Sequence, residues 1–455
     1  MKIKPILDSE FVPAVLWNRS FEQEAENSSD AVTIGLFRND KVVARRTLKV
    51  LSDVDRSFQY LERLLKAMLW AIGGNRVLFA GPDEIFQRLE KHYSASAIGR
   101  FDSEIIGEKI YDHALKIEKA AADEIPEPSQ EGAALGRHLD GCRIGFDLGG
   151  SDRKCAAVID GEVVFSEEIK WDPYFEKNPQ YHFEGTMASL KRAAEHLPRV
   201  DAIGGSAAGV YVNNEVRVAS LFRGVPDDQF EEKVRPIFKQ LKEAWGGIPF
   251  DVVNDGEVTA LAGAMSLKDD AVLGISMGTS LAAGYVTPEG NITSWLNELA
   301  FVPVDYRENG PVDEWSGDAG CGVQFFSQQG VARLAPLAGI EFPADTPFAE
   351  QLVEVQRLMA EGDQRARQIY ETIGVCFGYT IAHYSDFYDF RNLLILGRVT
   401  SGEGGQIIIE KAEAVLRAEF PSLAEKISIT TPDEQMKRHG QAVAAASLPM
   451  IGGKA

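Results

Sequence analysis

Residues 143–151 read Arg-Ile-Gly-Phe-Asp-Leu-Gly-Gly-Ser, an apolar run that ends in an aspartate and leads directly into two glycines. Such a run is typical of a buried strand, and the glycines after it predict a tight turn. A second apolar run follows at 155–159, and the turn Asp160-Gly161 separates it from a third run at 163–165. We therefore expect three successive strands, joined first by a glycine turn and then by a short hairpin.

The same pattern occurs a second time, further along the chain. An apolar run at 271–277 ends in the turn Gly-Thr-Ser at 278–280, and further apolar runs follow at 283–286 and 292–295. The two glycine turns begin 129 residues apart (278 − 149 = 129). This repetition predicts two similar domains that face each other.

The two glycine turns have two interpretations. Backbone N–H groups in a turn without side chains form a concave row of donors that suits phosphate. Alternatively, each turn needs glycine only for its backbone conformation. Matching turns in a repeated pattern favour phosphate binding. The candidate residues are Gly149, Gly150, Ser151, Gly278, Thr279 and Ser280.

Two aspartates lie at the ends of predicted strands. Asp147 precedes the first glycine turn. It is either a buried carboxylate that accepts hydrogen bonds from the amides of the turn or a carboxylate that holds Mg²⁺ through water. Asp255 follows the apolar strand 250–253, where a helix begins near Glu257. It is either the N-cap of that helix or a general base that accepts a proton from an attacking hydroxyl. The sequence leaves both pairs of alternatives open.

Composition limits the class of partner. The 455 residues suffice for two to four domains, and 45% hydrophobic with 25% charged residues indicates a globular protein. A net charge of −21 opposes binding to nucleic acid or to anionic lipid, so we expect a small-molecule ligand, no nucleic acid and no membrane. The four cysteines show no CxxC spacing, which predicts free thiols. The sequence shows no signal peptide and no apolar run of about 18 residues, so we expect a cytoplasmic protein.

The first part of the chain is expected to form a small α/β module at 1–118, followed by an exposed linker at 119–140 that contains Pro126 and Pro128. A helix capped by Asp53 should run to Gly73. The other expected elements are a hairpin at 31–37 and 41–44, a strand at 77–80, and helices near 82–93, 103–118, 227–245 and 364–385. In the last of these helices, Gly374 and Gly378 predict close helix packing, and Trp70 and Trp295 are expected in the core.

In their order along the chain, these motifs resemble the ROK family of sugar kinases and repressors, within the actin and hexokinase superfamily. The resemblance covers about residues 143–450. It implies an α/β fold with two actin/hexokinase-like (ribonuclease H-like) domains and a cleft between them, in addition to the N-terminal module. The implied bounds are 141–263 for the first domain and 264–437 for the second, with a C-terminal helix at 438–455 that returns to the first.

The resemblance also implies residue roles. Asp255 stands at the position of the catalytic aspartate, and Asp147 would hold Mg²⁺ through water. Gly397 follows a strand that is similar to the family's adenosine-side strand, and Gly284 accompanies the second phosphate motif. ATP and Mg²⁺ are the implied cofactors. The implied sugar-binding residues are Asn254, Glu298, Ser206 and Gly209.

The sequence departs from the family pattern at several positions. Phe301 stands where ROK kinases have a histidine three residues after the sugar-binding glutamate. Only Gly320-Cys321 represents the zinc loop, and the glutamate expected soon after falls on Val323 or Gln324, so we expect no structural zinc. The seven histidines show no metal-ligand spacing. Leu281-Ala282-Ala283 replaces a more glycine-rich sequence, which limits how closely the backbone approaches a nucleotide.

These observations favour ATP-dependent phosphorylation of a sugar hydroxyl, with a possible homodimer. The alternative is a non-catalytic sugar- or nucleotide-binding protein, a sensor or regulator, which the replaced histidine and glutamate support. Repressors of the family carry a winged helix-turn-helix ahead of the sugar-binding part. Here the N-terminal segment has a strand hairpin, and residues 1–140 carry 19 basic and 23 acidic residues, a net charge of −4, which argues against DNA binding.

Overall fold

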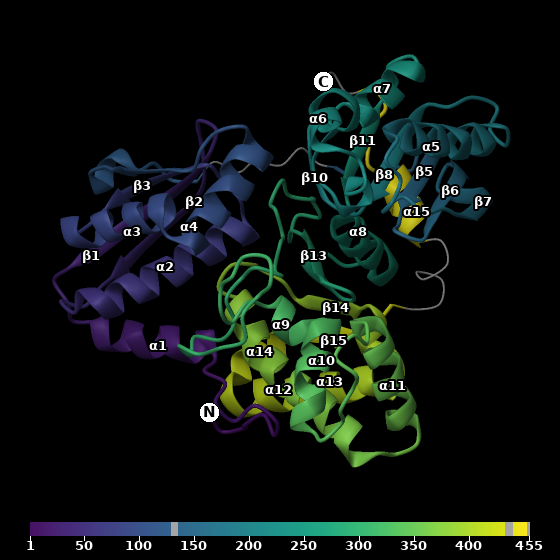
Figure 1. Cartoon of the computed structure of the whole chain (residues 1–455). Coiled ribbons are helices and arrows are strands. Elements are labelled where there is room, and N and C mark those ends of the chain that lie inside the picture. Colours follow the sequence, from purple (N-terminus) through teal and green to yellow (C-terminus); the bar gives the residue numbers. More distant parts are fainter. Residues whose placement is uncertain (129–134, 433–439, 453–455) are drawn as a thin grey trace. The chain divides into compact units, whose positions relative to one another are not determined.

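The computed structural model describes residues 1–128, 135–432 and 440–452 (Figure 1). Contacts divide the chain into two compact units. Unit 1 comprises Met1–Glu131, Ile275–Ala283 and Ser294–Thr430, and unit 2 comprises Gly132–Gly274, Gly284–Thr293 and Thr431–Ala455. The bounds differ from the predicted domains, because the N-terminal residues share a unit with the C-terminal half of the chain. Parts of the predicted linker and of the predicted helix 438–455, with Glu131 and His439, lie outside the described residues.

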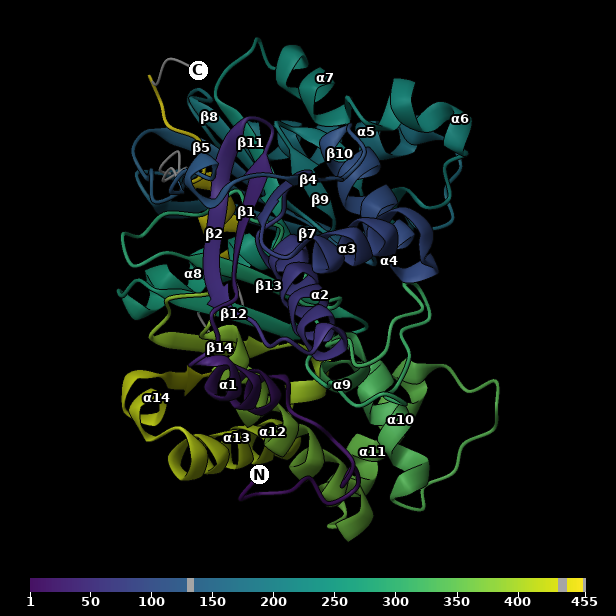
Figure 2. The same ribbon diagram turned by 90° about the vertical axis from the view of Figure 1, so that its left-hand side faces the viewer.

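The N-terminal part of unit 1 is a four-stranded sheet with helices on one face, as both ribbon views show (Figures 1 and 2). The strand order is β2-β1-β3-β4, and the predicted hairpin is confirmed as antiparallel β1 and β2. Asp53 caps α2 as predicted, by accepting from the N–H of Arg56. The elements are α1 (Ala14–Ala25), β1 (Ala31–Arg38), β2 (Lys41–Lys49), α2 (Val54–Ala71), β3 (Arg76–Ala80), α3 (Asp83–Ala95), α4 (Ala97–Asp102), the π-helix η1 (Ser103–Ile110) and β4 (Lys116–Lys119).

Two elements of this part differ from the prediction. The helix expected at 103–118 ends at Ile110, and Lys116–Lys119 forms a strand that pairs in parallel with β3. The pairing buries Ile117 in the sheet, so tertiary contact decides the conformation of a segment with ambiguous local preference. Helix α1 was not predicted.

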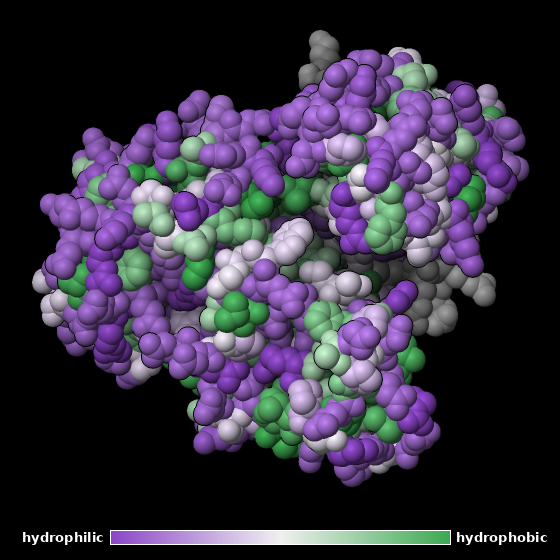
Figure 3. All heavy atoms as spheres, viewed as in Figure 1, coloured by the Kyte–Doolittle hydropathy of each residue, from purple (hydrophilic) through white to green (hydrophobic). Residues whose placement is uncertain are grey.

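The surface of the molecule that Figure 3 presents is covered mainly by hydrophilic residues, with smaller apolar areas between them.

Unit 2 is built on a five-stranded sheet in the order β11-β8-β5-β6-β7. β5, β8 and β11 are parallel, whereas β6 and β7 are antiparallel additions, which confirms the predicted strand–turn–strand–strand run. The helix expected near 227–245 is divided before Pro236, which cannot continue a helix. The main elements are β5 (Cys142–Leu148), β6 (Asp152–Ile159), β7 (Glu162–Lys170), α5 (Pro179–Ala194), β8 (Ala202–Ala207), α6 (Asp227–Gln229), α7 (Ile237–Ala244), β11 (Phe250–Asn254), α8 (Asp255–Leu267) and α15 (Gln441–Ala446).

Paired glycines seat helix α15 on the sheet of unit 2. Gly145 and Gly204 lie opposite each other on β5 and β8. A Cβ atom at either glycine would overlap a backbone carbonyl of α15, that of Ala442 or that of Ala445. Glycine is therefore required at both positions so that the helix can approach the sheet backbone. Helix α15 ends at Ala446, short of the range predicted from the sequence.

The C-terminal half of unit 1 surrounds the sheet β13-β12-β14-β15, whose strands β12 and β13 pass from one unit to the other. The third strand expected at 292–295 is absent, since the structure describes only an isolated bridge between Val286 and Ile292. Gly374 and Gly378 pack against α13, as predicted. The elements are β12 (Val272–Met277), β13 (Leu281–Val286), α9 (Val323–Phe326), α10 (Gln328–Leu337), α11 (Phe348–Ala360), α12 (Gln364–Tyr384), β14 (Asn392–Leu396), α13 (Glu403–Glu419), α14 (Pro421–Lys426) and β15 (Ser428–Thr430). No helix among the described residues is both long and apolar enough to span a bilayer.

Candidate functional site

The carboxyl ends of the three parallel strands in unit 2 bring together four of the predicted site residues. Asp147 on β5 is paired in register with Ser206 on β8, and both side chains are buried. Asn254 ends β11 opposite Ala207, and Asp255 begins α8 directly after it. Ligands of open α/β sheets bind at this edge, because the strands end there and loops and helices begin.

The side chain of Asn254 holds the backbone around Asp255. Its Nδ2 donates to the carbonyl oxygen of Gly209 at 2.6 Å, and its Oδ1 accepts from the N–H of Gly256 at 2.7 Å. Asn254 is therefore the N-cap of α8, and Asp255 occupies the first helical position. Oδ1 of Asp255 also accepts from the N–H of Gly256, at 3.0 Å. Since the capping position belongs to Asn254, capping does not account for Asp255.

The carboxyl group of Asp255 lies in an unfavourable environment for negative charge. Burial raises its pKa, and the neighbouring charge of Asp147 raises it further, to about 6. Burial likewise raises the pKa of Asp147, against the opposing effects of the Ser206 hydroxyl and Lys154. Two carboxyl groups at the ends of β5 and β11, on either side of β8, that repel each other form an electrostatic arrangement that is common in functional sites.

We expect Asp255→Asn to stabilise the protein at pH 8 and to stabilise it less at pH 5. The pKa of Asp255 is higher in the folded state than its ordinary value of 3.8. Ionisation therefore costs folding free energy, and stability is lost as the pH rises through about 6. Removing the charge should raise Tm at pH 8 by about 2 °C or more in scanning calorimetry. A Tm at pH 8 below that of the wild type would contradict this electrostatic account.

The first glycine turn, 149–151, joins β5 to β6. The N–H of Gly149 donates to the carbonyl oxygen of Asp152 at 2.9 Å, and Nε1 of Trp171 donates to the carbonyl oxygen of Gly149 at 2.7 Å. A Cβ atom at Gly150 would overlap the Tyr174 hydroxyl, which explains the second glycine. Ser151 is exposed. The turn is thus a closely packed corner at the same strand end as Asp147.

The second glycine turn, 278–280, lies in unit 1 beside Gly397. The N–H of Gly278 donates to the carbonyl oxygen of Ser280 at 2.9 Å, and Thr279 and Ser280 are exposed. Gly397 has a φ of 101°, and a Cβ atom there would overlap the backbone of Met277. The structure therefore brings together two glycine motifs that are about 120 residues apart in the sequence (397 − 278 = 119).

Two further residues near these motifs have structural explanations. Gln328, which the sequence did not single out, begins α10 and donates its N–H to the carbonyl oxygen of Gly278 at 2.9 Å. Gly284 lies against the first turn of α8, where a Cβ atom would overlap the carbonyl of Gly256. Gly284 is therefore required for packing within unit 2, whereas Gly278 belongs to unit 1.

Glu298 lies on a segment attached to the end of helix α2, within unit 1. Backbone N–H groups of residues 296–298 donate to the carbonyl oxygens of residues 72, 71 and 70, at 3.2, 3.0 and 3.0 Å. Phe301 packs on Trp70, with 4.2 Å between ring centroids. Trp70 is buried, as predicted. The N-terminal residues thus contact the predicted sugar-binding segment directly.

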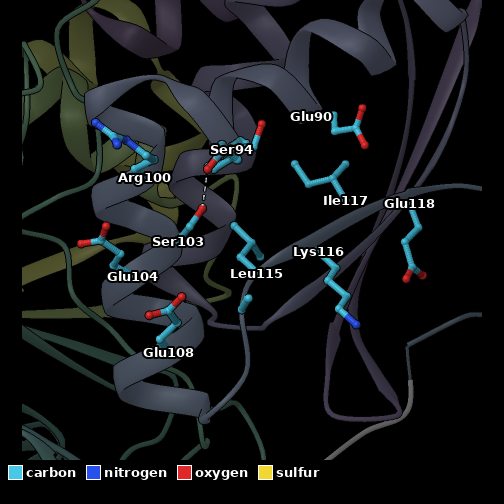
Figure 4. A pocket seen from close by; sticks show the side chains of 12 residues that line it. Glu90, Ser94, Arg100, Ser103, Glu104, Glu108, Leu115, Lys116, Ile117 and Glu118 are labelled. Atoms are coloured by element: carbon cyan, nitrogen blue, oxygen red, sulfur yellow. Dashed lines mark hydrogen bonds between the residues drawn. The ribbon is translucent and has the colours of Figure 1, made fainter.

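A pocket of 480 Å³ occurs elsewhere in the N-terminal part, between α3, α4, η1 and β4. Its lining residues include Glu104 and Glu108 on η1 and Lys116 and Glu118 on β4 (Figure 4). Ser103 is tied to this wall, because its hydroxyl donates to the carbonyl oxygen of Tyr93 at 2.8 Å. None of the predicted site residues lines the pocket.

Comparison with known proteins identifies the fold. No protein-family model matches the chain, and no curated protein matches its sequence. A ROK hexokinase from Thermus thermophilus superposes with a TM-score of 0.53 at 18% identity, over 67% of this chain and 96% of that one. The chain has the ROK fold.

Two other solved structures match to a similar extent. A ROK family transcriptional regulator, a homologue of the E. coli MLC protein, gives a TM-score of 0.54 at 19% identity, over 68% of this chain and 79% of the regulator. A putative N-acetylmannosamine kinase from Listeria monocytogenes gives 0.50 at 14% identity, over 67% and 97%. The expected fold class is therefore confirmed. Because kinases and a regulator share the ROK fold, the fold does not decide between the two functions.

Proposed function

We propose that this ROK-fold chain is an ATP-dependent sugar kinase in which Asp255 is the general base. The observation that carries the proposal is the environment of Asp255, whose pKa is raised to about 6 by burial and by Asp147, at the end of β11. A base with this pKa is largely ionised at neutral pH and still accepts a proton readily. Asn254 caps α8 and holds the backbone on both sides of Asp255, so the Asp255 side chain is not needed as the cap.

Each unit has its own part in this proposal. In unit 2, Asp255 accepts the proton of the acceptor hydroxyl, and Asn254, Ser206 and Gly209 shape the surrounding strand ends. In unit 1, Glu298 binds acceptor hydroxyls. For ATP phosphates, unit 2 would contribute the N–H groups of Gly150 and Ser151, and unit 1 those of Thr279 and Ser280, with Gly397 on the adenosine side.

Mg²⁺ fits the charges of unit 2. Asp147 and Asp255 repel each other, as the raised pKa of Asp255 shows, and a divalent cation would relieve that repulsion. No group of three or more histidine, cysteine, aspartate or glutamate residues suited to a metal occurs in the described part of the chain. In this proposal Asp147 would hold Mg²⁺ through water, and the bound ion would neutralise charge on the ATP phosphates.

The second candidate is a sugar- or nucleotide-binding regulator without turnover. Two observations favour it: the ring of Phe301 packs on Trp70 at the position where the sequence resemblance implies a histidine, and one structural neighbour is a transcriptional regulator. The N-terminal residues form a mixed sheet with helices, and the net charge of −4 on residues 1–140 does not favour DNA.

One assay separates these functions. The chain is incubated with Mg-ATP and a panel of hexoses, N-acetylhexosamines and polyols, and ADP release is measured. The kinase proposal requires acceptor-dependent ADP release with at least one compound. If the whole panel gives none while ATP still binds, the regulator replaces the kinase as the proposed function.

We expect Gly397→Ala to weaken the binding of Mg-ATP by about tenfold or more. The new Cβ atom would overlap the backbone of Met277 and so displace the glycine turn 278–280, which follows Met277. Gly402→Ala is the matched control, because Gly402 also has a positive φ, of 71°, but has open space around its Cβ position. Titration calorimetry with a non-hydrolysable ATP analogue measures both. Equal losses in the two variants would show that the contact with Met277 has no role in nucleotide binding.

A further inference from the structure

A buried cluster of charges joins helix α2 to the segment that follows Glu298. The Lys66 ammonium is fully buried, 3.2 Å from Asp102 and 2.9 Å from Asp318. Arg63, one turn earlier, donates to both carboxylate oxygens of Asp318, at 2.9 and 3.2 Å. Buried charges are tolerated only where partners compensate them closely, so this cluster depends on contributions from both parts of the chain.

Lys66 and Asp318 both keep their charge although they are buried. Burial lowers the pKa of Lys66, but the carboxylates of Asp102 and Asp318 raise it by more, so the ammonium form is favoured. Burial raises the pKa of Asp318, and Arg63 and Lys66 lower it below its ordinary value. The interaction between α2 and Asp318 is therefore a true ion pair.

Asp318 belongs to a folded-back segment whose two sides are hydrogen-bonded to each other. The carbonyl of Asp318 accepts from the N–H of Asp313 at 2.8 Å, and its Oδ1 accepts from the N–H of Ala319 at 2.8 Å. Two residues later, the carbonyl of Gly320 accepts from the N–H of Val304 at 2.8 Å. Fixing Asp318 therefore fixes the residues just after Phe301.

A second contact from the same face of α2 reaches this segment. Trp70 lies four residues after Lys66, and Nε1 of Trp70 donates to Asp102 at 2.9 Å, on the carboxyl group that also binds Lys66. The ring of Trp70 packs on Phe301, and the backbone carbonyl of Trp70 accepts from the N–H of Glu298. One helical face thus holds the segment 296–321 at its beginning and at its return.

We infer that Lys66 is a positioning residue: through Asp318 it fixes the segment 296–321 and with it Glu298, so that the N-terminal residues are an integral part of the acceptor-binding site. The statement about the acceptor rests on the proposed kinase function. The statement about the segment does not, because it concerns contacts within unit 1 alone.

Hydrogen exchange of the whole chain tests the first statement. In Lys66→Met, amides of residues 296–321 should exchange at least about tenfold faster than in the wild type, whereas those of α13, in the same unit, should keep their protection. Lys119→Met is the matched control, because Lys119 forms an exposed ion pair with Asp83 in the same N-terminal part. Unchanged protection of 296–321 in folded Lys66→Met would overturn the inference, as would an equal loss throughout unit 1.

Kinetics with the best acceptor of the panel tests the second statement. Lys66→Met should raise the KM for the acceptor by about tenfold or more and change the KM for ATP by no more than about twofold. If Lys66→Met does not fold, Asp318→Asn replaces it, since Lys66 then keeps Asp102 as its partner. Equal changes in both KM values would overturn the assignment to the acceptor. If no compound is phosphorylated, the kinase proposal fails, and hydrogen exchange alone decides the role of Lys66.

Discussion

Asp255→Asn is expected to lower turnover of a sugar acceptor by about 10²-fold or more, and to leave the affinity for Mg-ATP nearly unchanged. The carboxamide has the shape of the carboxylate but cannot accept the proton of the attacking hydroxyl. Because Asn254 caps α8, the helix should begin at the same residue in the variant. Steady-state ADP release and calorimetry with an ATP analogue measure the two quantities separately.

A matched variant guards against a general effect of removing a carboxylate. Asp227 is also the first residue of a helix in unit 2, α6, but it is exposed. Asp227→Asn should retain wild-type turnover. If Asp255→Asn retained it as well, Asp255 would not be the general base, and the mechanism proposed for this chain would be wrong.

Gly204→Ala should lower the free energy of unfolding by about 3 kcal/mol, because one methyl group would overlap the backbone carbonyl of Ala445 in α15. Neither the helix nor the strand can yield locally, since Gly145 on the neighbouring strand meets the same helix just as closely. Turnover should fall too, because α15 also bonds α8, where Gln441 donates to Thr259 at 2.8 Å. Denaturant unfolding and scanning calorimetry measure the loss.

Gly185→Ala provides the comparison. Gly185 lies inside helix α5 of the same unit, and a Cβ atom there would be in ordinary contact with Trp171, at 3.5 Å. Alanine in a helix interior is favoured over glycine by about 1 kcal/mol, so this variant should be slightly more stable than the wild type. Equal destabilisation of the two variants would show that the contact with α15 is not what requires Gly204.

The parts of the site that lie at strand ends were predictable from the sequence. Asp147 and Asp255 each follow an apolar run and precede a turn or a helix, and that local pattern is sufficient to place them at the edge of a sheet. That Asn254, rather than Asp255, is the N-cap of α8 was not predictable. It depends on the Asn254 side chain, whose second partner, Gly209, is 45 residues away.

The role of α2 could not be predicted for the same reason. Lys66 stands in an amphipathic helix where a lysine usually faces solvent, and its partner Asp318 is 252 residues further on (318 − 66 = 252). Likewise, residues 116–119 form a strand only because β3 offers an edge. A pattern read along the chain reports local preference, and contacts at long sequence separation override it.

The divided course of unit 1 has a consequence for its synthesis. Ribosomes extend chains at roughly 5–20 residues per second, so Asp318 emerges roughly 13–50 seconds after Lys66. Until residues 296–321 are translated, near the end of that interval, the Lys66 and Trp70 side chains, which are buried in the finished protein, have none of their partners from that segment. All of unit 2 up to Gly274 is translated in the meantime. The nascent N-terminal residues should therefore need protection by a chaperone, although they leave the ribosome first.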